Sequence, residues 1–264
     1  MTLPPDKLNL RRLAIIVAAL ALAGCDDGTL RLSKTLAREA ASGPVTMTVR
    51  PDPQSPGHGR SMTFRLPKGY YEAATIYRGE ILAINIRWRY PTGEPPGKDS
   101  EPTGVGIPPE HIIEARLSPY EYAQNVPMTA ADIETGRLMD TMASSYRGRP
   151  NQALGERYCG FDVYDSAATP WGRVSKGSGP EIDPRLLVPA PLNHARLFAH
   201  ATSPGRYDLL VICEPVPPTG WCRAGTSFEG WSLTTYASGS HLCDFPAIVA
   251  RTQALMRGSL VAGD

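Results

Sequence analysis

The sequence ILAINIRWRY, residues 81–90, is the stretch that determines the fold class. Large apolar side chains recur at every second position: Leu82, Ile84, Ile86, Trp88 and Tyr90. Polar side chains fill positions between them: Asn85, Arg87 and Arg89. A period of two over this length is typical of a half-buried β-strand. The stretch therefore predicts a strand with one face toward the core and the two arginines on the other.

Further strands are predicted on both sides of this one. The candidates are SMTFRL (61–66), HIIEARL (111–117), YCGFDVYD (158–165), ARLFAHA (195–201), YDLLVIC (207–213) and GWSLTTYA (230–237). Residues 129–146 have some helical character without a clean apolar face. The last segment, 244–260, has Asp244 as a candidate N-cap and Pro246 in the first turn, which indicates a helix. Its apolar face is formed by Ile248, Thr252, Leu255 and Met256. The predicted fold is α+β, mainly an antiparallel sheet with a C-terminal amphipathic helix packed on it.

The composition fits a globular protein, and the length suggests one domain of ordinary to large size or two small ones. The chain has 264 residues, of which 42% are hydrophobic and 20% charged. Residues 51–60, PDPQSPGHGR, are typical of a linker, so residues 25–60 are predicted to be a tether with room for a short helix at 31–41. Residues 61–264 are then a single domain. Residues 91–110 contain six prolines and four glycines and predict a long exposed loop, of a kind that often carries function.

The N-terminus has the three parts of a secretory signal. Lys7, Arg11 and Arg12 precede an uncharged, mostly apolar run at 13–24. That run is too short to span a membrane, which takes about 20 apolar residues. The alternatives at this point are a plain secretory signal peptide, a short uncleaved anchor, and the signal peptide of a lipoprotein.

The last residues of this segment, Leu22-Ala23-Gly24-Cys25, resemble the lipobox of bacterial lipoproteins. The resemblance implies that residues 1–24 are a lipoprotein signal peptide and that the Cys25 thiol takes a diacylglyceryl group, with an acyl chain such as palmitate on its freed amine. Two or more chains give stable anchoring. In enteric lipoproteins, Asp at the position of Asp26 implies retention in the inner membrane. The expected location is the periplasmic face of the cell envelope, with the inner membrane favoured over the outer.

Four cysteines remain beside Cys25, an even number suited to an oxidising compartment. Cys213 ends an apolar run and Cys222 follows a proline-rich turn. A hairpin would place them opposite each other, so the first-choice pairing is Cys213–Cys222, which leaves Cys159–Cys243. The alternative is a zinc site with His194, His200 or His241, but no tight Cys/His spacing supports it. No metal and no cofactor is predicted.

Charge and motifs exclude several function classes. The net charge is +1 and no basic run exceeds two residues, so nothing favours nucleic acid as a partner. No nucleophile elbow, zinc-protease motif or phosphate-binding loop occurs. Asp162 and Asp165 fall on opposite faces of a strand, which argues against a carboxylate pair. A candidate binding surface consists of Arg87 and Arg89 beside Tyr90. Aromatic residues that are either core or binding anchors are Tyr70, Tyr71, Tyr77, Trp221 and Trp231.

A wider pattern resembles uncharacterised proteobacterial periplasmic lipoproteins. It consists of FRLPKGYY (64–71), RWRYP (87–91), two cysteines nine positions apart, FEGWSLTTY (228–236) and a terminal helix. The resemblance implies no activity. The first hypothesis is a non-catalytic, lipid-anchored periplasmic module that binds a protein partner as an accessory or immunity-like factor. The alternatives are an envelope hydrolase using His194, His200 or His241 with a nearby acid, and a structural envelope component.

Overall fold

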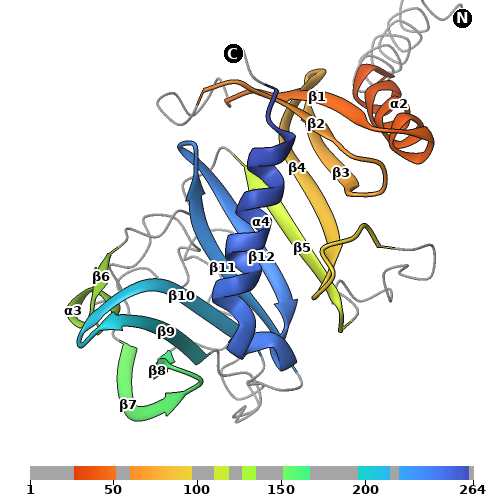
Figure 1. Cartoon of the computed structure of the whole chain (residues 1–264). Coiled ribbons are helices and arrows are strands. Elements are labelled where there is room, and N and C mark those ends of the chain that lie inside the picture. Colours follow the sequence, from red (N-terminus) through yellow and green to blue (C-terminus); the bar gives the residue numbers. More distant parts are fainter. Residues whose placement is uncertain are drawn as a thin grey trace, which may run out of the picture.

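A computed structural model describes residues 27–51, 60–96, 110–118, 127–134, 151–166, 196–214 and 220–261. The dominant element is one 12-stranded sheet in the order β2-β1-β4-β5-β12-β11-β10-β9-β8-β7, with β3 added to β4 and β6 to β10 (Figure 1). The strands are β1 (Val45–Val49), β2 (Met62–Leu66), β3 (Tyr71–Tyr77), β4 (Glu80–Arg89), β5 (Ile112–Ser118), β6 (Met128–Thr129), β7 (Asn151–Tyr158), β8 (Phe161–Ser166), β9 (Arg196–Ser203), β10 (Arg206–Glu214), β11 (Trp221–Phe228) and β12 (Trp231–Ser238). The helices are α2 (Asp27–Ser42), α3 (Ala130–Glu134) and α4 (Phe245–Ser259), with the 3-10 helix η2 (Gly239–Asp244).

The sheet is antiparallel throughout except where β1 meets β4 in parallel, at Val49 and Ile81. The C-terminal helix α4 crosses the face of the sheet over β11 and β12 (Figure 1). The predicted α+β class, with a mainly antiparallel sheet and a C-terminal helix on it, is confirmed in this broad form, although the sheet is larger than the strand candidates indicated.

The central strand β4 has the predicted alternation from Ile84 onward. Ile84, Ile86 and Trp88 are buried on the α4 side, and Arg87 lies on the other side. The alternation fails at Leu82, because the pairing with β3 shifts between Ala83 and Ile81. This bulge leaves Leu82 without an opposite residue, and Ile81 takes its expected place in the core.

The strand predicted over residues 158–165 is present from Phe161 onward, as β8, but its predicted start at Tyr158 is wrong. Tyr158 ends β7 and Phe161 begins β8, and the turn between them consists of Cys159 and Gly160. Both turn residues have positive φ, +50° and +87° respectively. A two-residue turn with positive φ at both positions matches the twist of an antiparallel hairpin. The glycine therefore marks a chain reversal here, not a position inside a strand.

The tether predicted for residues 25–60 is also wrong over residues 27–49, although the short helix allowed at 31–41 is present within α2. Helix α2 packs against β3 and β1, with Leu36 buried at the contact. Strand β1 places Val45, Met47 and Val49 in the core and pairs with β2 along its whole length. The proline-rich part of the predicted linker, residues 52–59, lies outside the described residues, as does most of the loop predicted at 91–110. The folded body thus begins well before Ser61.

Helix α4 closes the core on its side of the sheet. Its buried face consists of Phe245, Ile248, Val249, Thr252, Met256 and Ser259, while Leu255 is only partly buried. Asp244 is the N-cap residue, as expected, but its carboxylate makes no capping hydrogen bond. The Trp88 indole donates a hydrogen bond to Thr252 Oγ1 at 3.2 Å, and that hydroxyl donates to the Ile248 carbonyl at 2.9 Å. This contact ties the helix to the central strand.

Two disulfides cross-link the structure, one between β10 and β11 and one between the β7–β8 turn and η2. Cys213 and Cys222 are directly opposite each other on β10 and β11 and are fully buried. Cys159, in the β7–β8 turn, is joined to Cys243 of η2, across 84 positions of sequence. These two disulfides form the first-choice pairing, one of the three pairings that four cysteines allow. Since all four sulfurs are in disulfides, none is a thiolate for the zinc alternative.

Candidate functional site

The side of the sheet away from α4 carries a row of charged and aromatic side chains. Register places Arg223, Tyr236, Glu114 and Arg87 side by side on β11, β12, β5 and β4. Their neighbours in sequence point to the α4 side, since residues alternate between the faces of a strand. We call this surface the charged face and define it by Glu72, Arg87, Arg89, Glu114, Arg116, Trp221, Arg223 and Tyr236.

One arginine organises the charges at this face. Arg87 Nε lies 2.9 Å from Glu72 Oε1 and 2.9 Å from Glu114 Oε1, and its Nη2 also contacts Glu114. All three side chains are at most a quarter exposed. Burial raises the pKa of Glu72, and the nearby Glu114 carboxylate raises it further, against the opposing effect of Arg87. Arg87 therefore serves to hold two half-buried carboxylates together.

Next to this network, two aromatic rings line a groove. The rings of Trp221 and Tyr236 are 5.8 Å apart, and the Arg223 guanidinium lies 5.4 Å from the centre of the Trp221 ring. The groove has a volume of about 220 Å³. Its lining consists of Glu72, Asn85, Glu114, Ala115, Arg116, Trp221 and Tyr236. Arginine, tryptophan and tyrosine are the residues that most often dominate the energy of protein–protein contacts.

The predicted binding surface of Arg87, Arg89 and Tyr90 is only partly present. Arg87 is at the charged face, and alternation places the exposed Arg89 on the same side, two positions along β4. Tyr90 is on the other side, where its ring lies 6.2 Å from Trp88 and 4.9 Å from His241. Burial raises its pKa, with a smaller contribution from Asp244. The groove residues on β3, β5 and β12 could not be found from one strand, because register brings them together.

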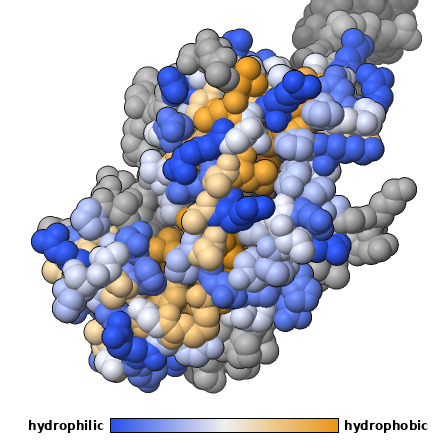
Figure 2. Space-filling view, in the orientation of Figure 1, coloured by the Kyte–Doolittle hydropathy of each residue, from blue (hydrophilic) through white to orange (hydrophobic). Residues whose placement is uncertain are grey.

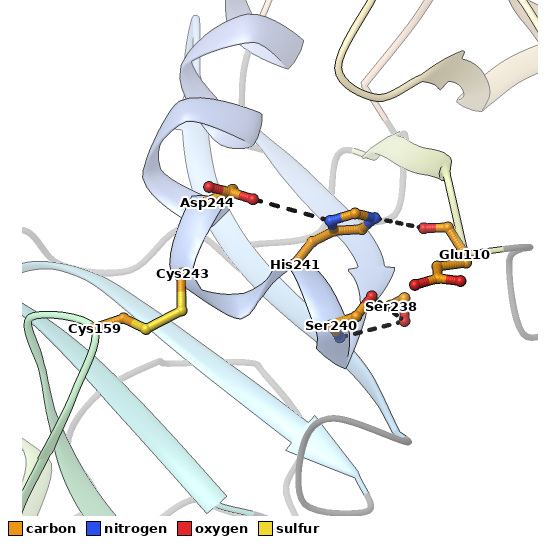
Figure 3. Close-up of polar contacts among 7 residues, drawn as sticks. All are labelled: Glu110, Cys159, Ser238, Ser240, His241, Cys243 and Asp244. Atoms are coloured by element: carbon orange, nitrogen blue, oxygen red, sulfur yellow. Dashed lines mark hydrogen bonds and ion pairs between the residues drawn. A yellow bond between two sulfur atoms is a disulfide. The ribbon is translucent and has the colours of Figure 1, made fainter.

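His241 of η2 has a structural role (Figure 3). Its Nε2 is 2.7 Å from the Glu110 carbonyl oxygen, its Nδ1 is 4.0 Å from Asp244, and the side chain is only 12% exposed. Ser238 and Ser240 lie nearby, but they bond to each other. With both ring nitrogens directed to neighbouring groups, His241 joins η2 to the start of β5 and is poorly placed as a general base.

His200 forms the second histidine–acid pair. Its Nδ1 is 2.7 Å from Asp208 Oδ1, and within the described residues this is the ring's one hydrogen bond. Asp208 lines a groove of about 250 Å³ beside α4, together with Leu209, Thr226, Ser227, Pro246, Val249, Ala250 and Gln253. Figure 2 shows apolar surface in the hollows along this helix. His194, the third candidate, lies outside the described residues, and so does the side chain of Asp165.

Asp162 does not stand in a carboxylate pair but accepts a hydrogen bond from Tyr207, one of two buried tyrosines that are bonded to each other. The Tyr207 hydroxyl donates to Asp162 Oδ2 at 2.9 Å and accepts from the Tyr164 hydroxyl at 2.9 Å. Arg157 Nε lies 3.0 Å from Asp162 Oδ1. Burial raises the pKa of Tyr207 well above its usual 10.0, and the hydrogen bonds to Tyr164 and Asp162 add to the effect. This network ties β10 to the β7–β8 hairpin.

Replacement Tyr207→Phe is expected to lower the free energy of unfolding by about 1–3 kcal/mol, because Tyr164 and Asp162 lose a buried partner. Above pH 10 the unfolded chain ionises at this residue while the folded chain keeps the proton. Wild-type stability should therefore fall more steeply with rising pH than that of the variant, by about 1.4 kcal/mol per pH unit. Urea unfolding of both proteins at about pH 8 and about pH 11 measures both effects. If the free energy of unfolding falls equally with pH in the wild type and in Tyr207→Phe, the raised pKa of Tyr207 is contradicted.

The described ranges contain no group of three His, Cys, Asp or Glu side chains placed to hold a metal ion. None of the helices in these ranges has the length and apolar composition that crossing a membrane requires.

The aromatic residues singled out in the sequence differ in their surroundings. Trp231 is core, at 1% exposed, whereas Tyr77 is 43% exposed at the end of β3. Tyr70 is partly buried and donates to the Gly93 carbonyl at 2.8 Å, so the first residues after β4 are held against the sheet.

Comparison with known proteins gives two similar solved structures. No protein-family model matches the sequence, and no curated protein does. Smlt3025, an immunity protein of the Stenotrophomonas maltophilia type IV secretion system, has a TM-score of 0.45 and 14% identity, over 83% of this chain and 94% of that one. FrpD, the iron-regulated outer membrane lipoprotein of Neisseria meningitidis, has a TM-score of 0.36 and 10% identity, over 81% of this chain and 92% of that one. At these values the similarities carry no information about the site.

Proposed function

We propose that the protein is a non-catalytic binding module of the bacterial cell envelope, which holds a protein partner on the charged face. A lipid on Cys25 would anchor it at the periplasmic side of the membrane, and Asp26 would favour the inner membrane. The lipobox residues support the anchor, and the two disulfides suit an oxidising compartment. An accessory or immunity-like role is the most specific form of this proposal.

The groove at the charged face is the observation that carries the binding role. Trp221 and Tyr236 are half-buried and in contact with each other on the sheet, so they lose little conformational freedom when a partner covers them. Arg116 and the Arg87 network surround them with groups that fix the orientation of a partner. Aromatic anchors inside a polar rim are typical of protein–protein interfaces.

Double replacement Trp221→Ala/Tyr236→Ala is expected to abolish capture of the partner from detergent-solubilised envelopes of the native host. Loss of two central aromatic anchors costs about 2 kcal/mol or more each, which is at least about a 30-fold loss of affinity per anchor. A matched control removes two exposed aromatic rings that do not line the groove, Tyr77→Ala/Tyr158→Ala. One protein retained by the wild type and the control but not by the groove variant supports the proposal. Equal retention by all three contradicts it, as does capture of nothing.

The second candidate function is an envelope hydrolase, favoured by the His200–Asp208 pair beside the α4 groove. A carboxylate on Nδ1 orients an imidazole so that Nε2 can act as a general base. Turnover of nitrophenyl esters or of dye-labelled peptidoglycan by the purified protein, lost in His200→Ala and kept in His111→Ala, would establish it. If the wild type shows no turnover and captures a partner, the hydrolase function is rejected and the binding function stands.

A further inference from the structure

Among the side chains described on the charged face, cations outnumber anions. Arg87, Arg89, Arg116 and Arg223 are cationic, and Glu72 and Glu114 are anionic. The whole chain, by contrast, carries a net charge of only +1. A partner of complementary charge would therefore be anionic.

The arginines differ in what surrounds them. Arg87 is held between two carboxylates, so an incoming anion at its position would be repelled by both. Arg116 donates to the Thr75 hydroxyl at 3.3 Å, a neutral partner that leaves its charge in place. Arg89 is exposed near the end of β4. The cations suited to an incoming anion are thus Arg116 and Arg89, on the two sides of the Arg87 network.

Register gives the spacing between these two cations. Arg116 is opposite Asn85, and Arg89 is four residues further along β4 than Asn85. At about 3.4 Å per residue, the two positions are about 14 Å apart, which is also close to the length of four residues of an extended peptide. Trp221 and Tyr236 lie beside this line, where an aromatic or apolar side chain between the two anionic groups could pack on them.

We propose that the charged face binds an extended acidic segment of a protein, with two carboxylates four residues apart on Arg116 and Arg89 and an aromatic side chain between them on Trp221 and Tyr236. The inference rests on the proposed binding function and names the chemistry of the partner. Arginine is suited to carboxylates because its planar group donates two parallel hydrogen bonds. Glu72 and Glu114 disfavour a compact, multiply charged anion such as phosphate, because it would have to approach both carboxylates.

A fluorescent peptide with two glutamates four positions apart and a tyrosine midway between them tests this proposal by anisotropy on the purified mature chain. We expect binding that weakens as salt is raised, and about a 10-fold weakening with Arg116→Gln or Arg89→Gln. Arg257→Gln, which changes an exposed residue of α4, is the matched control and should bind as the wild type does. The same peptide with glutamines, or with glutamates two positions apart, should bind at least about 10-fold more weakly.

Absence of peptide binding, or an equal loss in the Arg257→Gln variant, would overturn the proposal. So would binding of inorganic phosphate, or of phosphatidylglycerol vesicles, with the same dependence on Arg116 and Arg89, because either would assign the surface to another anion. If the captured envelope protein depends on Trp221 and Tyr236 but is indifferent to both arginines, the binding function stands and the acidic segment is rejected.

Discussion

Replacement Cys25→Ala is expected to abolish incorporation of an alkyne-labelled fatty acid and to move the protein from the detergent phase to the aqueous phase on Triton X-114 partition. A single acyl chain gives only marginal membrane binding, and two or more give stable anchoring, so loss of the lipidated residue removes essentially all of the anchor. The run at 13–24 is too short to replace the lipid as a stable span.

A matched control for the anchor is Asp26→Ser, which keeps the acceptor cysteine. This variant should remain labelled and stay in the detergent phase, and sucrose-gradient separation of the envelope should show a shift from inner toward outer membrane. Fatty-acid labelling that persists in Cys25→Ala would contradict the lipoprotein assignment, and an unchanged gradient position of Asp26→Ser would contradict the sorting role.

Replacement Trp88→Ala is expected to lower the free energy of unfolding by about 3–5 kcal/mol, the usual cost of removing a buried tryptophan side chain. The indole is 1% exposed and sits between β4 and α4, so its removal leaves a cavity and leaves the Thr252 hydroxyl without its donor. Guanidinium unfolding without reductant measures the change while both disulfides stay closed.

Trp88→Phe separates packing from hydrogen bonding in this contact. It keeps an aromatic ring and loses the hydrogen bond, so we expect a smaller loss of about 1–2 kcal/mol. Trp221→Ala, on the charged face, should change stability by less than Trp88→Ala, because Trp221 is only half-buried. A Trp88→Ala variant within about 1 kcal/mol of the wild type would show that α4 is not held to the sheet as described.

The residues that sequence reasoning placed correctly share a local signal. Ile84, Ile86 and Trp88 alternate with polar residues within one strand, and the pairing of Cys213 with Cys222 follows from one hairpin. Strand β1 was missed because VTMTV is short and its partner β2 lies beyond a proline-rich stretch. Strand β3 was missed because its side chains are mostly half-buried, so no strong apolar period exists.

The site depends on long-range register and is harder to predict. Arg87 and Glu114 meet because β4 pairs with β5 in one particular register, and Glu72 reaches them at a bulge in β3. Trp221 and Tyr236 join the groove through two further pairings. A shift of one residue in any of these pairings would move the side chains to the α4 side. Alternation within one strand predicts which residues share its face, but not which residues of other strands stand beside them.

The most direct test of a binding role for the charged face is site-specific photo-cross-linking in living cells of the native host. Benzoylphenylalanine would replace Tyr236 in the groove or, as the matched position on the other side of the sheet, Gln253 of α4. We expect one discrete cross-linked envelope protein from position 236, lost when Trp221→Ala is added, and none from position 253. Cross-linking from position 253 with none from position 236 would contradict that role.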